Sequence, residues 1–343
     1  MLLRIATLVA AVTLAASIFS RPSAATPPSG FELGIVSNAG GLLAAAPIGR
    51  LGAPVARVEF SIDSSPVRIA PVIAAFARHG VRVLLLAGFR GRIPTTAEAR
   101  NLATWAQAFG AGGTFWRNRS RGDLAVRDIE FGNETNYGYQ YGGCGPGCSG
   151  YVERARAYAL ALKDAQEAID GPLGNPQVGV LAIADEAGST STDWLSGMLE
   201  VVPDLPRRIA GWTVHPYGPR SRWQPQIDRL VSETQARGAA GSVPIYITEL
   251  GVASDNGPCL SDNYGWNPCM TYGQAASSLK STLLAIRARY GERIHAIFIF
   301  QALDQRRPGF DNYREYYFGV LTSSGAAKGA YTATVGSLLT TLR

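Results

Sequence analysis

Eight short apolar runs recur along the chain and are separated by longer amphipathic stretches. This alternation leaves few folds open, because strands that read as nearly continuous apolar segments are buried on both faces of a sheet. Parallel strands of this kind need long crossover connections, which are usually helices. We therefore predict eight parallel strands joined by helices. The predicted strands are Phe31–Ser37, Val55–Ile62, Val81–Ala87, Asp128–Gly132, Val178–Ile183, Ile209–His215, Pro244–Thr248 and Ile294–Gln301.

Helix signals lie between the predicted strands. Thr95–Glu98 and Thr271–Gln274 match the capping box, in which two side chains satisfy the first backbone N–H groups of a helix. We expect these helices to end near Gly110 and Gly291. An open, doubly wound sheet would alternate in the same way, but the first turn after a strand lacks the G-x-G-x-x-G pattern of nucleotide-binding folds. Eight strands favour a closed (β/α)8 TIM barrel built as a single domain.

The first residues have the order of a secretory signal peptide. A short basic start is followed by an apolar run from Ile5 to Phe19 and by small residues at 23–25. We expect residues 1–25 to be removed near Ala25, leaving residues 26–343 as an exported barrel domain with no membrane span. An uncleaved amino-terminal anchor is the alternative.

The charge of the chain says little about its partners. The formal net charge is +6, and the basic residues are scattered along the sequence. We therefore expect no nucleic-acid surface, and we expect a monomer.

Four cysteines form two local pairs in the sequence. Cys144 and Cys148 are separated by three residues, and Cys259 and Cys269 by nine. An even number of cysteines in an exported chain predicts disulfides, here Cys144 with Cys148 and Cys259 with Cys269. A zinc site is the competing interpretation, but neither spacing is the short C-x2-C of structural zinc sites.

Two glutamates stand at the ends of predicted strands, where chemistry gathers in a barrel of this kind. Glu134 closes the fourth run after Gly132-Asn133, and Glu249 closes the seventh after Ile247-Thr248. Carboxylates at the ends of strands four and seven would enter one mouth from opposite walls, as double-displacement hydrolysis of a glycosidic bond requires. Either glutamate taken alone is equally consistent with a solvated residue at a strand end.

These motifs resemble clan A of the glycoside hydrolases, whose acid/base follows an Asn on strand four and whose nucleophile ends strand seven. His215-x-Tyr217 looks like the strand-six element of the family 5 type, and Arg57 looks like the clan's strand-two arginine. The resemblance covers most of the mature chain. It implies a retaining O-glycosidase with Glu134 as acid/base and Glu249 as nucleophile, which acts on a polysaccharide or its oligosaccharides without metal or organic cofactor.

The chain also departs from these families. Members of family 5 usually carry a Trp at the end of strand eight and a His after strand three, where this chain has Phe300-Gln301 and Gly88-Phe89-Arg90. Family 5, family 39 and their smaller relatives therefore remain open, and so does the sugar. Gln301 is included among the candidate substrate-binding residues.

The chemistry suggests roles for the neighbours of the two glutamates. The negative charge of Glu249 would raise the pKa of Glu134 and keep it protonated as a general acid. Asn133 would hydrogen-bond the 2-hydroxyl of the sugar, a contact that strengthens in the transition state. Tyr217 would donate a hydrogen bond to Glu249.

Two further residues have open roles. Arg57 would hold Glu249 ionised, unless it pairs with Glu59 or another carboxylate of the barrel. His215 either contacts the sugar or is a buried histidine that orients Tyr217.

Aromatic residues gather in the loops after the fourth and seventh strands. Tyr137 precedes the first cysteine pair, and Trp266 lies between the cysteines of the second. Aromatic faces stack on sugar rings, so we expect both residues to bind substrate, although aromatic residues under long loops also form local cores.

Two other functions are compatible with a barrel. A carbohydrate-binding protein that had lost catalysis would have no chemical need for both glutamates together with Asn133 and Tyr217. A metal-dependent hydrolase would need clustered His and Asp residues at strand ends, and only His215 is suitably placed.

Overall fold

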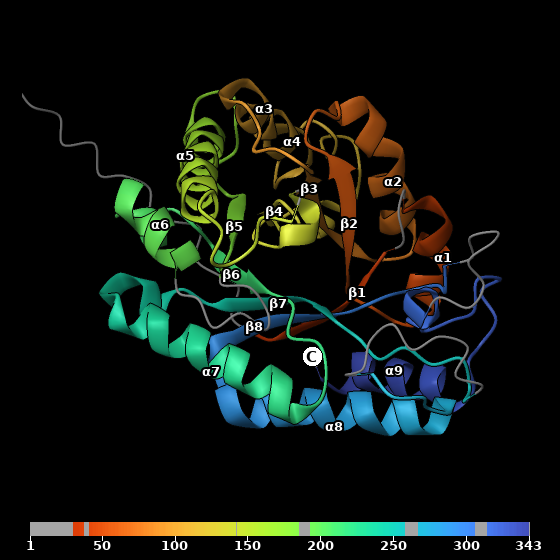
Figure 1. Ribbon diagram of the computed structural model, residues 1–343. Helices are drawn as coiled ribbons and strands as arrows, with labels where there is room; N and C mark the ends of the chain where they lie inside the picture. Colours follow the sequence, from red (N-terminus) through yellow and green to blue (C-terminus); the bar gives the residue numbers. More distant parts are fainter. Residues whose placement is uncertain are drawn as a thin grey trace, which may run out of the picture.

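The protein is a closed eight-stranded parallel barrel surrounded by helices, as the computed structural model shows (Figure 1). The structure describes residues 30–37, 41–141, 143–184, 193–257, 267–305 and 314–342. The strands are β1 Glu32–Val36, β2 Val55–Ser61, β3 Arg82–Gly88, β4 Asp128–Phe131, β5 Gly179–Ile183, β6 Gly211–Val214, β7 Ile245–Leu250 and β8 Ile294–Ile299. Each coincides with a predicted strand to within a few residues at its ends, so the predicted fold class is confirmed.

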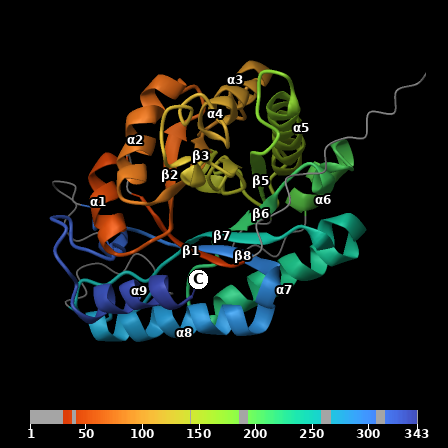
Figure 2. The same ribbon diagram turned by 180° about the vertical axis from the view of Figure 1, so that it is seen from behind.

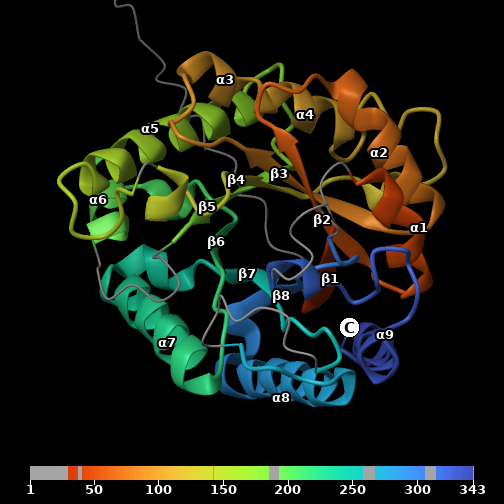
Figure 3. The ribbon, with the colours of Figure 1, turned by 45° about the vertical axis from the view of Figure 1, so that its right-hand side comes forward.

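Helices connect the strands and form an outer ring around them, which is clearest in Figure 3. They are α1 Leu42–Arg50, α2 Pro66–Arg78, α3 Thr96–Arg100, α4 Leu102–Phe109, α5 Tyr151–Asp170, α6 Asp193–Val201, α7 Arg220–Ala236, α8 Tyr272–Tyr290 and α9 Ala330–Thr341. Strand β1 pairs with β8 to close the barrel, and α8 and α9 lie side by side at this junction (Figure 2).

Both predicted capping boxes are present. The hydroxyl of Thr95 accepts from the backbone of Glu98, and the hydroxyl of Thr271 accepts from the backbone of Gln274. The first helical segment is divided at Asn101 into α3 and α4, and α4 ends at Phe109, next to the predicted end at Gly110. The second, α8, ends at Tyr290, next to Gly291, as predicted. At the division, the Asn101 side chain donates to the carbonyl of Ile62.

Apolar side chains form two layers, one inside the barrel and one between the strands and the helices. The inner layer is small and crowded. A Cβ added to Gly211 would lie 2.3 Å from the ring of Tyr246, and one added to Gly34 would lie 2.7 Å from Phe298. Glycine on these strands therefore makes room for aromatic rings, which fill the barrel and form the floor beneath its mouth.

The inward face of β2 shows how the barrel positions polar side chains. Val55 belongs to the inner apolar layer, and side chains alternate between the two faces of a strand. Arg57, two residues further on, therefore lies on the same inward face at the carboxyl end of the barrel, where it is 3% exposed.

Candidate active site

The turn after β4 aims Glu134 into the mouth. Gly132 has φ 83° and Glu134 has φ 45°, and a Cβ at Gly132 would lie 2.5 Å from the hydroxyl of Thr135. Only glycine fits the first position without strain. Glu134 adopts a left-handed conformation that costs about 1–2 kcal/mol for an ordinary residue, and such strain is often found at functional sites.

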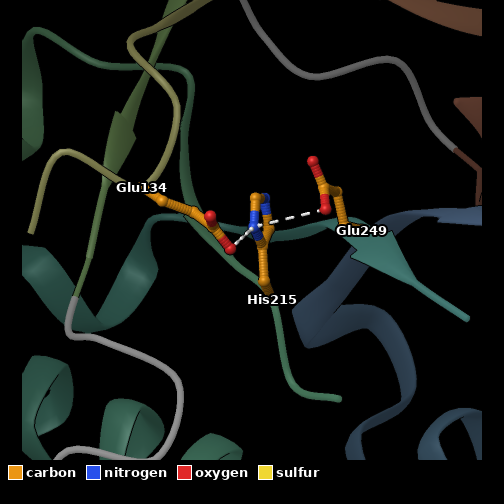
Figure 4. Close-up of side chains that lie close together, drawn as sticks. All are labelled: Glu134, His215 and Glu249. Carbon is orange, nitrogen blue, oxygen red and sulfur yellow. Dashed lines mark hydrogen bonds and ion pairs between the residues drawn. The ribbon is translucent and has the colours of Figure 1, made fainter. Parts of the chain in front are cut away.

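The predicted pair of glutamates comes together in the mouth, with His215 between them (Figure 4). Glu134 follows β4, Glu249 is in β7, and His215 directly follows β6. One carboxylate oxygen of each glutamate and a ring nitrogen of His215 all lie within 4.8 Å of one another. His215 Nδ1 is 2.9 Å from Glu134 Oε1 and 3.8 Å from Glu249 Oε2.

The environment shifts the pKa values of the two glutamates in opposite directions. Burial raises the pKa of Glu134, and the charge of Glu249 adds to this, against the opposing effect of His215. The expected direction is therefore correct, but burial rather than Glu249 is the main cause. Burial also acts to raise the pKa of Glu249, but the charges of His215 and Arg57 and the hydroxyl of Tyr217 outweigh it, so that this pKa is lowered.

Arg57 binds the side chains around Glu249. Its Nη1 donates to Glu249 Oε1 at 2.7 Å, its Nη2 to Asn133 Oδ1 at 2.6 Å, and its Nε to Glu130 Oε2 at 2.5 Å. The two interpretations of this arginine are therefore both correct, with Glu130 rather than Glu59 as the second carboxylate. Glu59 lies 3.6 Å from Arg90 instead.

His215 and Tyr217 contact the two glutamates separately. The hydroxyl of Tyr217 donates to Glu249 Oε2 at 2.8 Å, as predicted. His215 contacts Glu134 through Nδ1 and the hydroxyl of Thr248 through Nε2 at 3.0 Å. The pKa of His215 is raised, because the charges of Glu249 and Glu134 outweigh the opposing effect of burial.

Two residues of this site were not singled out from the sequence. Glu130 is 1% exposed on β4, and Thr248 is fully buried beside Glu249, where its hydroxyl donates to Glu130 Oε1 at 2.8 Å. The signal that points to Glu130 is a carboxylate between the apolar residues Ile129 and Phe131, which needs a cationic or hydrogen-bonding partner when buried.

The remaining candidates differ in position. Tyr137 lines a pocket together with Glu130, Glu134, Asn136 and His215. Gln301 is 1% exposed, and its side chain accepts from Gln305. The segment around Phe318 covers it by pairing with its backbone. Gln301 is therefore buried, as Arg57 and Glu249 are, and its contact with substrate stays a prediction. Trp266 lies outside the described residues.

The disulfide between Cys144 and Cys148 is present, so the first predicted pair is confirmed. The second pair includes Cys259, which lies outside the described residues. Between Cys148 and the barrel, the loop is held by Arg154, whose guanidinium lies 4.4 Å from the ring centre of Tyr141.

Glu134, His215 and Glu249 also form the kind of cluster that could ligate a cation. The atoms are already used in hydrogen bonds, however, and Arg57 places a positive charge directly on Glu249. This arrangement favours proton transfer and nucleophilic attack over metal binding.

The protein is therefore a (β/α)8 barrel with two carboxyl groups that face each other in its mouth. No protein-family model matches the chain, and no curated protein matches its sequence. Solved structures with this fold are nevertheless similar. A family 39 glycoside hydrolase from Bacteroides cellulosilyticus WH2 has a TM-score of 0.57 at 16% identity, over 91% of this chain and 64% of its own length.

Two other structures are similar to the same degree. A GH5_18 enzyme from Bifidobacterium longum has a TM-score of 0.55 at 12% identity, over 90% of this chain and 78% of its own. A fungal β-1,4-galactanase has a TM-score of 0.59 at 12% identity, over 85% of this chain and 90% of its own. At these identities the similarity establishes the fold, and the expected likeness to clan A barrels is confirmed at that level.

Proposed function

We propose that this protein is a retaining glycoside hydrolase that cleaves O-glycosidic bonds of a polysaccharide or its oligosaccharides. The observation that carries the proposal is the pair Glu134 and Glu249, whose facing oxygens lie within 4.8 Å. Retaining enzymes hold their two carboxyl groups about 5–5.5 Å apart, whereas inverting enzymes leave roughly 6.5–9.5 Å for a water molecule. The opposite pKa shifts of the two groups supply an acid and a nucleophile at one pH.

In the first step Glu249 attacks the anomeric carbon while the glycosidic bond breaks. Glu134 gives its proton to the leaving oxygen, which departs as an alcohol. The carboxylate of Glu249 becomes an ester, so its negative charge disappears. Glu134 has by then lost its proton and is a carboxylate beside a neutral ester.

In the second step Glu134 takes a proton from water, and the water oxygen bonds to the anomeric carbon. The ester bond to Glu249 breaks, which restores both glutamates to their starting forms. Two successive displacements return the anomeric carbon to its original configuration.

Neighbouring side chains support these steps. Arg57 and Tyr217 stabilise Glu249 as a carboxylate through one hydrogen bond to each of its oxygens. Asn133 accepts from Arg57 through Oδ1, which orients its amide so that Nδ2 can donate to a sugar hydroxyl. This fits the expected contact with the 2-hydroxyl.

Export is part of the proposal. The predicted signal peptide lies outside the described residues. The disulfide between Cys144 and Cys148, in the loop after β4, fits an oxidising compartment. Within the described part of the chain, no helix has the length and apolar character needed to cross a membrane.

The test is the configuration of the first-formed product, measured by proton NMR after screening polysaccharides and aryl glycosides for release of reducing ends. Retention is expected, and inversion would contradict the assignment of Glu249 as nucleophile. Glu249→Ala should abolish turnover, whereas Glu134→Ala should still be glycosylated by activated aryl glycosides, whose leaving groups need no proton. Azide should rescue Glu134→Ala and yield a glycosyl azide of retained configuration.

The matched control is Glu153→Ala, an exposed glutamate on α5 outside the site. It should turn over every substrate at the wild-type rate. A loss of activity equal to that of Glu134→Ala would point to folding rather than catalysis.

A further inference from the structure

A chain of hydrogen bonds runs behind the two glutamates and connects them through buried residues. It passes from Arg57 to Glu130, from Glu130 to Thr248, and from Thr248 to His215. The last residue reaches Glu134 through its second ring nitrogen. Glu130 borders the pocket beside Glu134, but its hydrogen bonds are to Arg57 and Thr248 rather than to Glu134 or Glu249.

The direction of each bond follows from what the groups can donate. Glu130 is ion-paired with Arg57, and a carboxylate can only accept. The single hydroxyl proton of Thr248 is therefore used toward Glu130 Oε1. The same oxygen can then only accept from His215, which requires a proton on Nε2.

We propose that Glu130 and Thr248 are positioning residues that fix the permanent proton of His215 on Nε2, so that the exchangeable proton at Nδ1 is shared with Glu134. This inference rests on the proposed acid/base role of Glu134 for its effect on catalysis. Its structural content, the tautomer of His215, is independent of any activity.

The consequence for Glu134 is a contact that requires one proton. With Nε2 protonated, neutral His215 presents a lone pair at Nδ1 to Glu134 Oε1 at 2.9 Å. Two lone pairs at this distance repel, so either the carboxyl group or Nδ1 must hold a hydrogen. Glu134 and His215 then lose their proton as a pair rather than as two separate groups, and the acid form of the pair persists to higher pH.

The charged groups around His215 come from three strands. Glu134 follows β4, Glu249 approaches from β7 at 3.8 Å, and Arg57 acts from β2. Glu130 faces it through Thr248. Removal of the Thr248 hydroxyl changes none of these charges, so its effect isolates the tautomer.

The direct test is NMR of protein labelled with 15N in the histidine rings, recorded across the pH range in which Glu134 and His215 lose their shared proton. The chain has three histidines, so His79→Gln and His295→Gln assign the signals. Wild-type His215 is expected as the Nε2–H tautomer, and the Nδ1–H tautomer would overturn the proposal.

Two variants should reverse the tautomer by different means. Thr248→Val leaves Nε2 without an acceptor, so the proton should move to Nδ1 and donate to Glu134. In Glu130→Gln the amide oxygen must accept from Arg57, so its NH2 faces Thr248, whose hydroxyl should then donate to Nε2. Thr248→Ser keeps the hydroxyl and should keep the wild-type tautomer, which controls for loss of the methyl group.

Activity gives the second measurement. With Nδ1–H donating to its carboxylate, Glu134 should lose its acid proton more easily, and the alkaline limb of kcat/KM should move down by about one pH unit. In Thr248→Val and Glu130→Gln, kcat/KM should fall at least about tenfold for substrates with poor leaving groups and only slightly for activated aryl glycosides. Thr248→Ser should have the wild-type kcat/KM for both.

The outcomes separate the two proposals. If the variants change the tautomer while no glycoside is ever cleaved, the proposed function fails and the tautomer assignment stands. If the enzyme is a glycosidase but Thr248→Val and Glu130→Gln keep both the wild-type tautomer and the wild-type alkaline limb, the positioning role is wrong.

Discussion

Arg57→Met should destabilise the fold strongly at neutral pH and much less in mild acid. Arg57 is 3% exposed and neutralises Glu130 and Glu249, whose side chains are 1% and 11% exposed. Methionine fills similar space but leaves both carboxylates buried without their cation. Removing one partner of a buried ion pair typically costs about 3–5 kcal/mol.

The structure gives a second route to the same magnitude. The variant can avoid a buried charge by protonating Glu249, whose ordinary pKa is 4.5. Holding one such carboxyl group protonated at pH 7 costs about 3.4 kcal/mol, at about 1.36 kcal/mol for each pH unit. In the wild type the lowered pKa of Glu249 contributes stability that is present above 4.5 and is lost as the pH falls through the folded value.

The penalty of Arg57→Met should therefore become smaller as the pH falls from 7 toward 4.5. Urea unfolding followed by tryptophan fluorescence at pH 7 and pH 4.5 measures both values. Arg121→Met, which removes an exposed ion pair with Asp123, is the control and should cost little at either pH. A loss under about 1 kcal/mol, or an equal loss at both pH values, would refute the reasoning.

Two other substitutions test the site and the barrel. Tyr217→Phe should lower kcat about tenfold to a hundredfold, which is the worth of one hydrogen bond to a charged group. It should also raise the pH at which the acidic limb of kcat/KM falls, because the Tyr217 hydroxyl helps to lower the pKa of Glu249. An unchanged pH profile would show that this hydroxyl does not stabilise the nucleophile. Gly211→Ala should lower the free energy of unfolding in urea by about 1–3 kcal/mol, because its Cβ would lie 2.3 Å from the Tyr246 ring. The control is Gly122→Ala, whose Cβ would meet nothing within 4 Å and which should change the stability little. Equal effects of the two substitutions would contradict tight packing inside the barrel.

The strands were predictable because burial on both faces leaves a direct trace in the sequence. The run before Glu249 is apolar from Ile245 to Ile247, so the polar residues that close it stand out. The fourth run is marked less clearly, by Ile129 and Phe131 before Gly132-Asn133-Glu134. The same logic placed His215 and Tyr217 at the end of β6. Strand ends in a parallel barrel share one side, and this single geometric fact brings together residues from distant parts of the chain.

What the sequence did not reveal depends on pairing across the barrel. Glu130 and Thr248 form a hydrogen bond between β4 and β7. The local sequence around either residue does not indicate its partner. Gln301 stands at a strand end like the others, and the backbone around Phe318 pairs with it. Pairing with a later segment of the chain has no local signal in the sequence.

The single arginine among these carboxylates also sets the electrical balance of the mouth. Glu130 and Glu249 contribute two negative charges and Arg57 one positive charge, while Glu134 and His215 sharing one proton add none. The group therefore carries one net negative charge before substrate enters. A sugar that develops positive charge at its anomeric carbon places that charge beside a group of net negative charge, while the matching negative charge forms on the leaving oxygen and on Glu134 as its proton departs. A neutral ground-state sugar has no such positive centre to stabilise. In a medium of low polarity that difference favours the transition state over the bound substrate.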